Sequence, residues 1–272
     1  IYFPIFFSGE IINNFDLVNI SEYFLGFFLF SITSYLIYLF NDWHDYQEDN
    51  KAKNKNIFLN FDIKQENIPI LSFVYLLIYT VFLLLFIKED NSLTHLILIS
   101  YICLNAFYNL KLKYLKNIDI VTVSFFYILR LIFGYEYFDI SMNIFEFTFI
   151  FCLSFFLVVN KRIIYKVKLK FKKISDYKRD IYNLSYLKKL SKLSLFFTLF
   201  FFTILMFSIQ KINLLFFLIN GLFYILMYDI FRKTHQVGRI LIQQTDYFKS
   251  ILSIKNIIFA LLMSYLFLLQ YF

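Results

Sequence analysis

The chain has 272 residues, of which 60% are hydrophobic and only 17% are charged, and its mean hydropathy is +0.65. Soluble domains contain about 45–50% apolar and about 25% charged residues, so this composition excludes a soluble domain and predicts an all-α protein that crosses a membrane repeatedly. The formal net charge is +8. Because most of the positive charge lies between apolar runs, we expect an anionic lipid surface or a polyphosphate as its partner, and no nucleic acid.

The chain begins at Ile1, without Met, in apolar sequence. We interpret residues 1–8 as the end of a truncated first transmembrane helix. Eight further apolar runs can cross about 30 Å of hydrocarbon as helices, which predicts nine spans in a single, N-terminally incomplete domain over 1–272. These runs lie at 23–40, 68–87, 92–109, 118–137, 143–160, 193–210, 212–229 and 251–271.

Lys and Arg divide the connections into two sets. The connections 41–67, 110–117, 161–192 and 230–250 contain 23 of the 27 Lys and Arg residues, and the connections on the opposite side contain two. The positive-inside rule places the basic set in the cytoplasm. We therefore predict a multi-pass protein of the cell (inner) membrane whose polar site faces the cytoplasm.

An acidic motif directly follows the run 23–40. Asp42, Asp45 and Asp49 stand at i, i+3 and i+7, a spacing that brings side chains to one face of a helix. Carboxylates at the junction of a span and water suit Mg²⁺, which completes its coordination with water and substrate phosphates. The alternative is an acidic helix end solvated in an interfacial loop. Asn41 precedes the motif, and Lys55 follows it as a candidate phosphate or lipid-headgroup contact.

Two further groups of polar residues lie at later helix ends. Tyr108, Lys113 and Asp119 surround the connection 110–117, and Arg130 lies within the span 118–137. An ionisable residue inside a span is a functional candidate by default, and a purely structural partner for a carboxylate is the less favoured alternative for Arg130. The third group is the pair Lys161 and Arg162 at the end of the span 143–160, which could bind phosphate or serve only as topology anchors.

The motif NDxxDxxxD after the second of nine spans resembles the UbiA prenyltransferase superfamily of intramembrane helical enzymes. The resemblance covers essentially the whole chain, in order and with compatible spacing, and is greatest to the branch that makes decaprenylphosphoryl-5-phosphoribose. The chain departs from that branch in two places. After the aspartates, residues 50–57 lack the Pro-containing segments usual in the branch. At the end of the sixth span, Asn160 and Tyr165 replace a Gly and a Glu. The residues that support the resemblance are Ser8, Gly9, Glu10, Asn41, Asp42, Asp45, Asp49, Tyr108, Leu110, Leu112, Lys113, Asp119, Leu129, Arg130, Gly134, Lys161 and Arg162.

The resemblance implies a Mg²⁺-dependent transferase that moves phosphoribose from phosphoribosyl pyrophosphate to a polyprenyl phosphate and releases pyrophosphate. Asp42, Asp45 and Asp49 would be the catalytic metal ligands. The residues implied in substrate binding are Asn41, Lys55, Tyr108, Lys113, Asp119, Arg130, Lys161 and Arg162.

Two other functions stay open. Prenyl transfer from a prenyl diphosphate to an aromatic acceptor would call for a second acidic motif, for which Asp176 and Asp180 are the candidates. A non-enzymatic transporter would be expected to contain repeats and helices broken by Gly or Pro, and the chain has only 5 Gly and 2 Pro. The oligomeric state is open as well, a homo-oligomer included.

Overall fold

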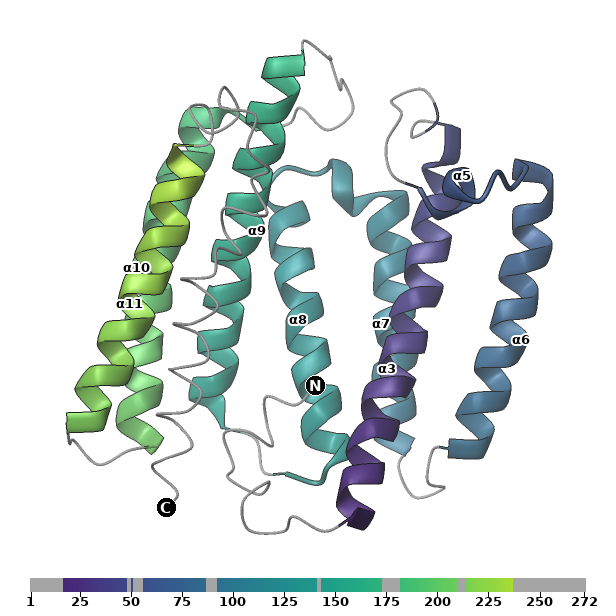
Figure 1. The fold of residues 1–272 in the computed structure, drawn as a ribbon, viewed down its shortest axis with the longest axis horizontal. Helices are drawn as coiled ribbons and strands as arrows, with labels where there is room; N and C mark the ends of the chain where they lie inside the picture. Colours follow the sequence, from purple (N-terminus) through teal and green to yellow (C-terminus); the bar gives the residue numbers. More distant parts are fainter. Residues whose placement is uncertain are drawn as a thin grey trace. The chain divides into compact units, whose positions relative to one another are not determined.

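The described part of the protein is helical. The computed structural model describes residues 17–47, 50, 56–86, 92–140, 143–172, 182–209 and 214–236, which form helices and turns and contain no strand. The prediction of an all-α protein is thus confirmed for these residues. The helices, shown in Figure 1, are α3 (Leu17–His44), α5 (Ile57–Asn60), η1 (Gln65–Asn67), α6 (Ile68–Phe86), α7 (Ser92–Leu110), η2 (Leu112–Tyr114), α8 (Ile118–Tyr137), α9 (Ile144–Lys172), α10 (Leu184–Ile209) and α11 (Leu214–His235).

Six of these helices contain stretches long and apolar enough to cross a membrane, which confirms the prediction of a multi-pass helical membrane protein. A further helix, α6, coincides with the run 68–87 and contains no charged residue. The runs 1–8 and 251–271 lie outside the described residues, so nine spans remain a prediction. The six stretches are Phe24–His44, Leu93–Leu110, Ile118–Tyr137, Ile144–Val167, Leu184–Ser208 and Leu214–His235.

The basic connection predicted over 161–192 is partly wrong. Helix α9 continues to Lys172, twelve residues beyond the predicted end of its span, and α10 begins at Leu184, nine residues before the predicted start. Lysine is a good helix former, and its long side chain can extend toward water from a helix that leaves the hydrocarbon. Hydropathy therefore identified the apolar parts of α9 and α10, and both helices extend beyond them into the lysine-rich sequence.

The chain divides into two compact units. The first unit comprises residues 1–113 and 129–142, and in it α3 packs against α6 and α7. Polar side chains join these helices: the hydroxyl of Thr33 on α3 donates to that of Tyr79 on α6 at 3.1 Å, and Tyr75 donates to the Ile32 carbonyl. Gly26 on α3 lies against the ring of Tyr137, where an added Cβ would come within 2.6 Å of a ring carbon. This close approach requires glycine at position 26.

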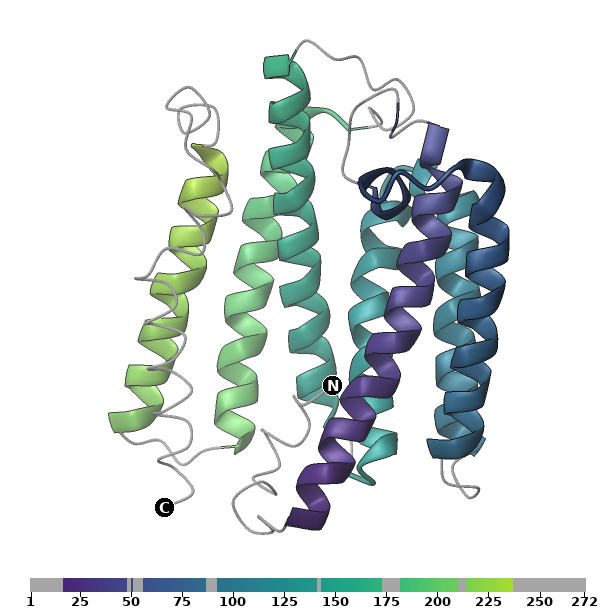
Figure 2. The same ribbon diagram turned by 45° about the vertical axis from the view of Figure 1, so that its right-hand side comes forward.

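The second unit comprises residues 114–128 and 143–272. Here α10 packs against α9 and α11, and α9 also contacts α11. Helices α9 and α11 run in one direction and α10 runs in the opposite direction (Figure 2). Three aromatic rings, those of Phe149, Phe202 and Phe223, meet at one point from the three helices, with centroid separations of 3.8 to 5.7 Å.

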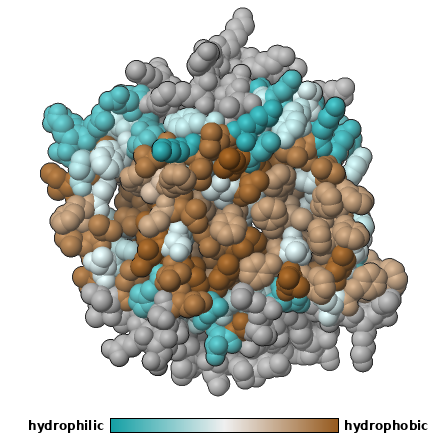
Figure 3. All heavy atoms as spheres, turned by 180° about the vertical axis from the view of Figure 1, so that it is seen from behind, coloured by the Kyte–Doolittle hydropathy of each residue, from teal (hydrophilic) through white to brown (hydrophobic). Residues whose placement is uncertain are grey.

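The helices carry many exposed hydrophobic side chains. Phe24 is 67% exposed, Leu96 63% and Leu214 75%. The face in Figure 3 shows hydrophobic residues along the middle of the helices, with hydrophilic residues gathered toward the upper end of the view. Lipid tails would cover such an apolar surface, whereas a soluble monomer rarely exposes one of this kind.

Candidate functional site

The end of α3 is fixed by a short segment that folds back onto Asp42. A carboxylate oxygen of Asp42 accepts the backbone N–H of Ile57 at 2.7 Å, and the side-chain amide of Asn56 donates to the Asp42 carbonyl at 2.8 Å. Asn56 also caps α5, because its Oδ1 accepts the N–H of Phe58. The segment beginning at residue 56 therefore holds Asp42 in place through both its backbone and its side chain.

Asp45 lies one residue beyond α3 and is buried, with 2% of its surface exposed. The ammonium group of Lys113 donates to its Oδ1 at 2.7 Å, and Nδ1 of His44 lies 3.0 Å from the same oxygen. Lys113 belongs to the 3₁₀ helix η2 that follows α7 and is itself 6% exposed. Two buried opposite charges in contact stabilise each other's ionised form.

The other candidates near the acidic motif are described in part. Asn41 is half-buried in the last turns of α3, and Tyr108 is half-buried near the end of α7. Asp49 and Lys55 lie outside the described residues, so the predicted stripe of three carboxylates is described for its first two members only.

Arg130 lies in the part of α8 that belongs to the first unit. Its guanidinium donates to the Tyr101 hydroxyl from Nε at 3.2 Å and from Nη2 at 2.8 Å. It also lies over the rings of Phe30 and Tyr101, with centroid distances of 5.8 and 5.7 Å. Aromatic faces and a hydroxyl therefore stabilise this cation inside the helical part of the chain.

In the second unit, Asp119 and Arg162 form an ion pair between α8 and α9. An oxygen of Asp119, which is 1% exposed, lies 2.5 Å from Nη2 of Arg162. Nearby on α9, Asn160 accepts a hydrogen bond from Ser191 on α10 at 2.9 Å. Lys161 is exposed. The predicted phosphate ligand Arg162 thus has a carboxylate partner within its own unit.

Tyr182 lies beside this ion pair in the segment before α10. Its hydroxyl accepts the backbone N–H of Asn117 at 2.8 Å, and Asn117 has a positive φ of 68°. Burial raises the pKa of Tyr182 to about 12. Tyr182 therefore joins the turn before α8 to the start of α10 as a neutral phenol.

Among the residues that the structure describes, no group of three or more His, Cys, Asp or Glu side chains is arranged to hold a metal ion. Mg²⁺ does not require such a group, since one or two carboxylates together with substrate phosphates can bind it. Asp42 and Asp45 supply hard oxygen donors of the right kind. Because Lys113 already contacts Oδ1 of Asp45, a cation there would have to share that carboxylate with the ammonium group.

Sequence reasoning did not identify several partners of the candidate residues. His44 and Asn56 contact the acidic motif, and Tyr101 contacts Arg130. For Asn56 a signal was present, because an Asn directly before an apolar segment is a common helix cap. Tyr101 is one of 22 tyrosines in an aromatic-rich chain, so nothing in the sequence distinguished it.

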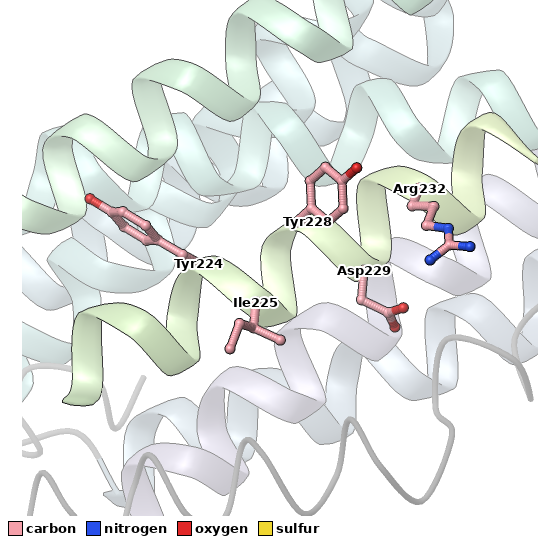
Figure 4. A pocket seen from close by; sticks show the side chains of 5 residues that line it. All are labelled: Tyr224, Ile225, Tyr228, Asp229 and Arg232. Atoms are coloured by element: carbon pink, nitrogen blue, oxygen red, sulfur yellow. The ribbon is translucent and has the colours of Figure 1, made fainter. Parts of the chain in front are cut away.

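A shallow pocket on α11 in the second unit is separate from these groups. Figure 4 shows its lining side chains, which all project from this one helix and include none of the predicted site residues. They are Tyr224, Ile225, Tyr228, Asp229 and Arg232.

No protein-family model matches the chain, and no curated protein sequence matches it. The chemistry of the residues described above is therefore the guide to function.

Proposed function

We propose that the protein is a UbiA-like intramembrane transferase that moves phosphoribose from phosphoribosyl pyrophosphate to a polyprenyl phosphate and releases pyrophosphate. The observation that carries the proposal is the fixed pair of carboxylates at the polar end of α3. Asp42 is held by the segment at Asn56 and Ile57, and Asp45 is held by Lys113. Carboxylates fixed where an apolar helix ends are suited to a water-soluble polyphosphate that must meet a lipid.

Asp42 and Asp45, together with Asp49, would hold Mg²⁺ in this proposal. The ion would supply electrostatic stabilisation of the pyrophosphate leaving group. Asn41, which precedes the first carboxylate, would orient it or a substrate hydroxyl. The contacts from residues 56 and 57 keep Asp42 in one position, so little reorganisation is required when a donor binds.

Lys113 has two roles in the proposal. Its ammonium group pairs with Asp45 in a buried place, and it would place a positive charge next to a site for phosphate oxygens. Because the acceptor phosphate is an anion at neutral pH, no strong base is required to activate it. The chain's task is to bring two anions together, and cationic side chains lower their mutual repulsion.

The remaining cations are assigned to phosphate groups within their own units. Arg130 would bind a phosphate in the first unit, with Tyr108 and Lys55 as further contacts, and Lys161 would bind one in the second unit. Arg162 and Asp119 would act together, with the carboxylate orienting the guanidinium. The polyprenyl chain would lie along the exposed apolar helix faces.

The test uses the full chain in membranes with Mg²⁺, a polyprenyl phosphate and labelled phosphoribosyl pyrophosphate. We expect a labelled, lipid-extractable product that disappears in Asp42→Ala and persists in Glu66→Gln, a matched control at an exposed acid of the first unit. Turnover of a prenyl diphosphate with an aromatic acceptor in its place would reassign the protein to aromatic prenyl transfer. Donor binding or passage without release of pyrophosphate would indicate a transporter.

A further inference from the structure

A buried carboxyl group lies in the second unit among apolar helices. Glu146 is the third residue of α9 and is 5% exposed. Its Oε2 is buried and makes no hydrogen bond within the described part of the chain. The helix N-terminus does not supply one, because the N–H groups of Phe145, Glu146 and Phe147 are all directed at Asn143, at 3.0 to 3.3 Å.

A second buried oxygen of this kind belongs to Asn220 on α11, which is 7% exposed. Its amide nitrogen donates to the Phe216 carbonyl at 2.9 Å. That hydrogen bond fixes which end of the amide is nitrogen and which is oxygen. Oδ1 of Asn220 is buried without a hydrogen-bond partner among the residues the structure describes.

The packing of α10 against α9 gives the level of Glu146. The rings of Phe149 and Phe202 are in contact, with centroids 5.2 Å apart. The two helices are antiparallel, so three residues back from Phe149 corresponds to three residues forward from Phe202. This register places Glu146 at the level of Leu205, whose side chain is fully buried.

The packing of α10 against α11 gives the level of Asn220 in the same way. Phe223 stacks on Phe202 with centroids 3.8 Å apart, and these helices are also antiparallel. Three residues back from Phe223 is Asn220, again at the level of Leu205. Glu146 and Asn220 therefore approach one level of the three-helix core from two different helices.

No opposite charge in these helix segments offsets an ionised Glu146. Residues 147–159 of α9, 199–208 of α10 and 214–228 of α11 contain no Lys, Arg, His, Asp or Glu. Their only other titratable side chains are Cys152, Tyr224 and Tyr228, and none of these groups is a cation. Burying a carboxylate without a paired cation is costly.

We propose that Glu146 and Asn220 form a proton-binding site in the core of the second unit. One proton on Oε2 of Glu146 would be donated to Oδ1 of Asn220, which satisfies both oxygens with a single bond. Two oxygens are few for a metal cation, and a proton requires no more than these two. The site joins α9 to α11 and is independent of the proposed transferase chemistry.

The test is infrared spectroscopy of the full chain in lipid at pH 7. We expect a carbonyl band of a protonated carboxylic acid that Glu146→Gln removes and that Asp139→Asn, a change at an exposed acid, leaves intact. In Asn220→Leu the band should persist and move to higher frequency, because the acid loses its acceptor. An identical spectrum for wild type and Glu146→Gln would overturn the proposal.

A second measurement separates the proton from a metal cation and does not depend on spectral assignment. Glu146→Gln keeps a donor for Asn220, so its thermal midpoint of unfolding should stay within a few degrees of wild type. Sodium or potassium should change the thermal midpoint of neither protein. Stabilisation of the wild type by either ion, lost in Glu146→Gln, would contradict the proton assignment. Glu146→Leu should unfold at a lower temperature than Glu146→Gln.

Discussion

Among the described residues, a buried carboxylate pairs with a cation in each unit, and the two pairs differ in their surroundings. In the first unit, Asp45 and Lys113 are both nearly inaccessible, with side-chain exposures of 3% and 5%, and His44 contacts the same carboxylate. In the second unit, Asp119 is buried, but Arg162 is 24% exposed. The first pair is therefore closed off within its unit, whereas the second retains a cation that reaches the surface.

The difference matters because breaking a pair costs most when the remaining charge cannot reach water. Lys113 without Asp45 would be a buried lysine, while Arg162 without Asp119 could extend toward solvent. We therefore expect that breaking the first pair costs more stability than breaking the second. Four substitutions test this comparison.

The largest effect is expected for Asp45→Ala. It leaves the ammonium of Lys113 buried without this carboxylate, and we expect a loss of about 3–5 kcal/mol in the free energy of unfolding together with undetectable transfer activity. Unfolding in mixed micelles measures the first quantity and the labelled-donor assay the second. The double variant Asp45→Leu with Lys113→Met should recover most of the stability and no activity. If the double variant lost as much stability as its two single substitutions added together, Asp45 and Lys113 would not be energetically coupled.

Asp119→Ala should have a smaller effect. It leaves Arg162, which is 24% exposed and can extend toward water, and the lost charge-assisted hydrogen bond contributes about 1.5–3 kcal/mol. The same unfolding measurement gives the loss, and Asp119→Asn, which keeps an oxygen acceptor for Arg162, should recover part of it. A loss as large as that of Asp45→Ala would show that partial exposure does not protect this pair, and would remove the distinction between the two units.

Asn56→Ala should follow. It removes the cap of α5 and the bond to the Asp42 carbonyl, and the loss of such a cap costs about 1 kcal/mol. Because Asp42 would then lose one of the contacts that hold it, we also expect activity to fall about tenfold, equivalent to about 1.4 kcal/mol of transition-state stabilisation. Asn56→Asp keeps an acceptor for the Phe58 N–H but cannot donate to the Asp42 carbonyl, so it separates the cap from the contact with Asp42 and should also lower activity. Unchanged activity in Asn56→Ala would mean that the position of Asp42 is set elsewhere.

Tyr182→Phe should have the smallest effect near neutral pH, about 1 kcal/mol, because Asn117 loses one hydrogen-bond acceptor. The pH dependence is more informative. Burial raises the pKa of Tyr182 to about 12 from an ordinary value of about 10, so the folded state binds the phenolic proton more tightly. This contribution to stability is complete below pH 10 and is lost as the pH rises through 12. Between pH 10 and 12, the free energy of unfolding should therefore fall less in Tyr182→Phe than in the wild type. An identical fall in both proteins would argue against a buried phenol.

Hydropathy alone predicted the position of most helices. The runs 68–87, 92–109 and 118–137 agree with α6, α7 and α8 to within a residue. The extents of α9 and α10 were missed, because a lysine that ends an apolar run does not end a helix. An apolar run shows which part of a helix lies in lipid or in the protein interior, but it does not show where the helix begins or ends.

The candidate site was predicted as a set of residues and not as a set of contacts. The sequence identified Asp45, Lys113 and Arg162 as individual candidates, yet it did not predict that Lys113 and Arg162 each pair with a carboxylate. Their carboxylate partners are 68 and 43 residues away in the chain, and only tertiary packing brings them together. Glu146 was missed, although an acid within an apolar run is a signal that the sequence contains.

The charged continuation of α9 and the start of α10 have a consequence for how a donor would arrive. In the second unit these two helices bring a group of cations to one end, among them Lys161, Lys166, Lys188, Lys189 and Lys192. An anionic leaflet has a surface potential of about −30 mV, which lowers the local concentration of any polyphosphate near it. Such a group of positive charges near the headgroups would offset part of that potential locally, and the encounter rate with an anionic donor would then depend on the lipid charge and the salt around the protein.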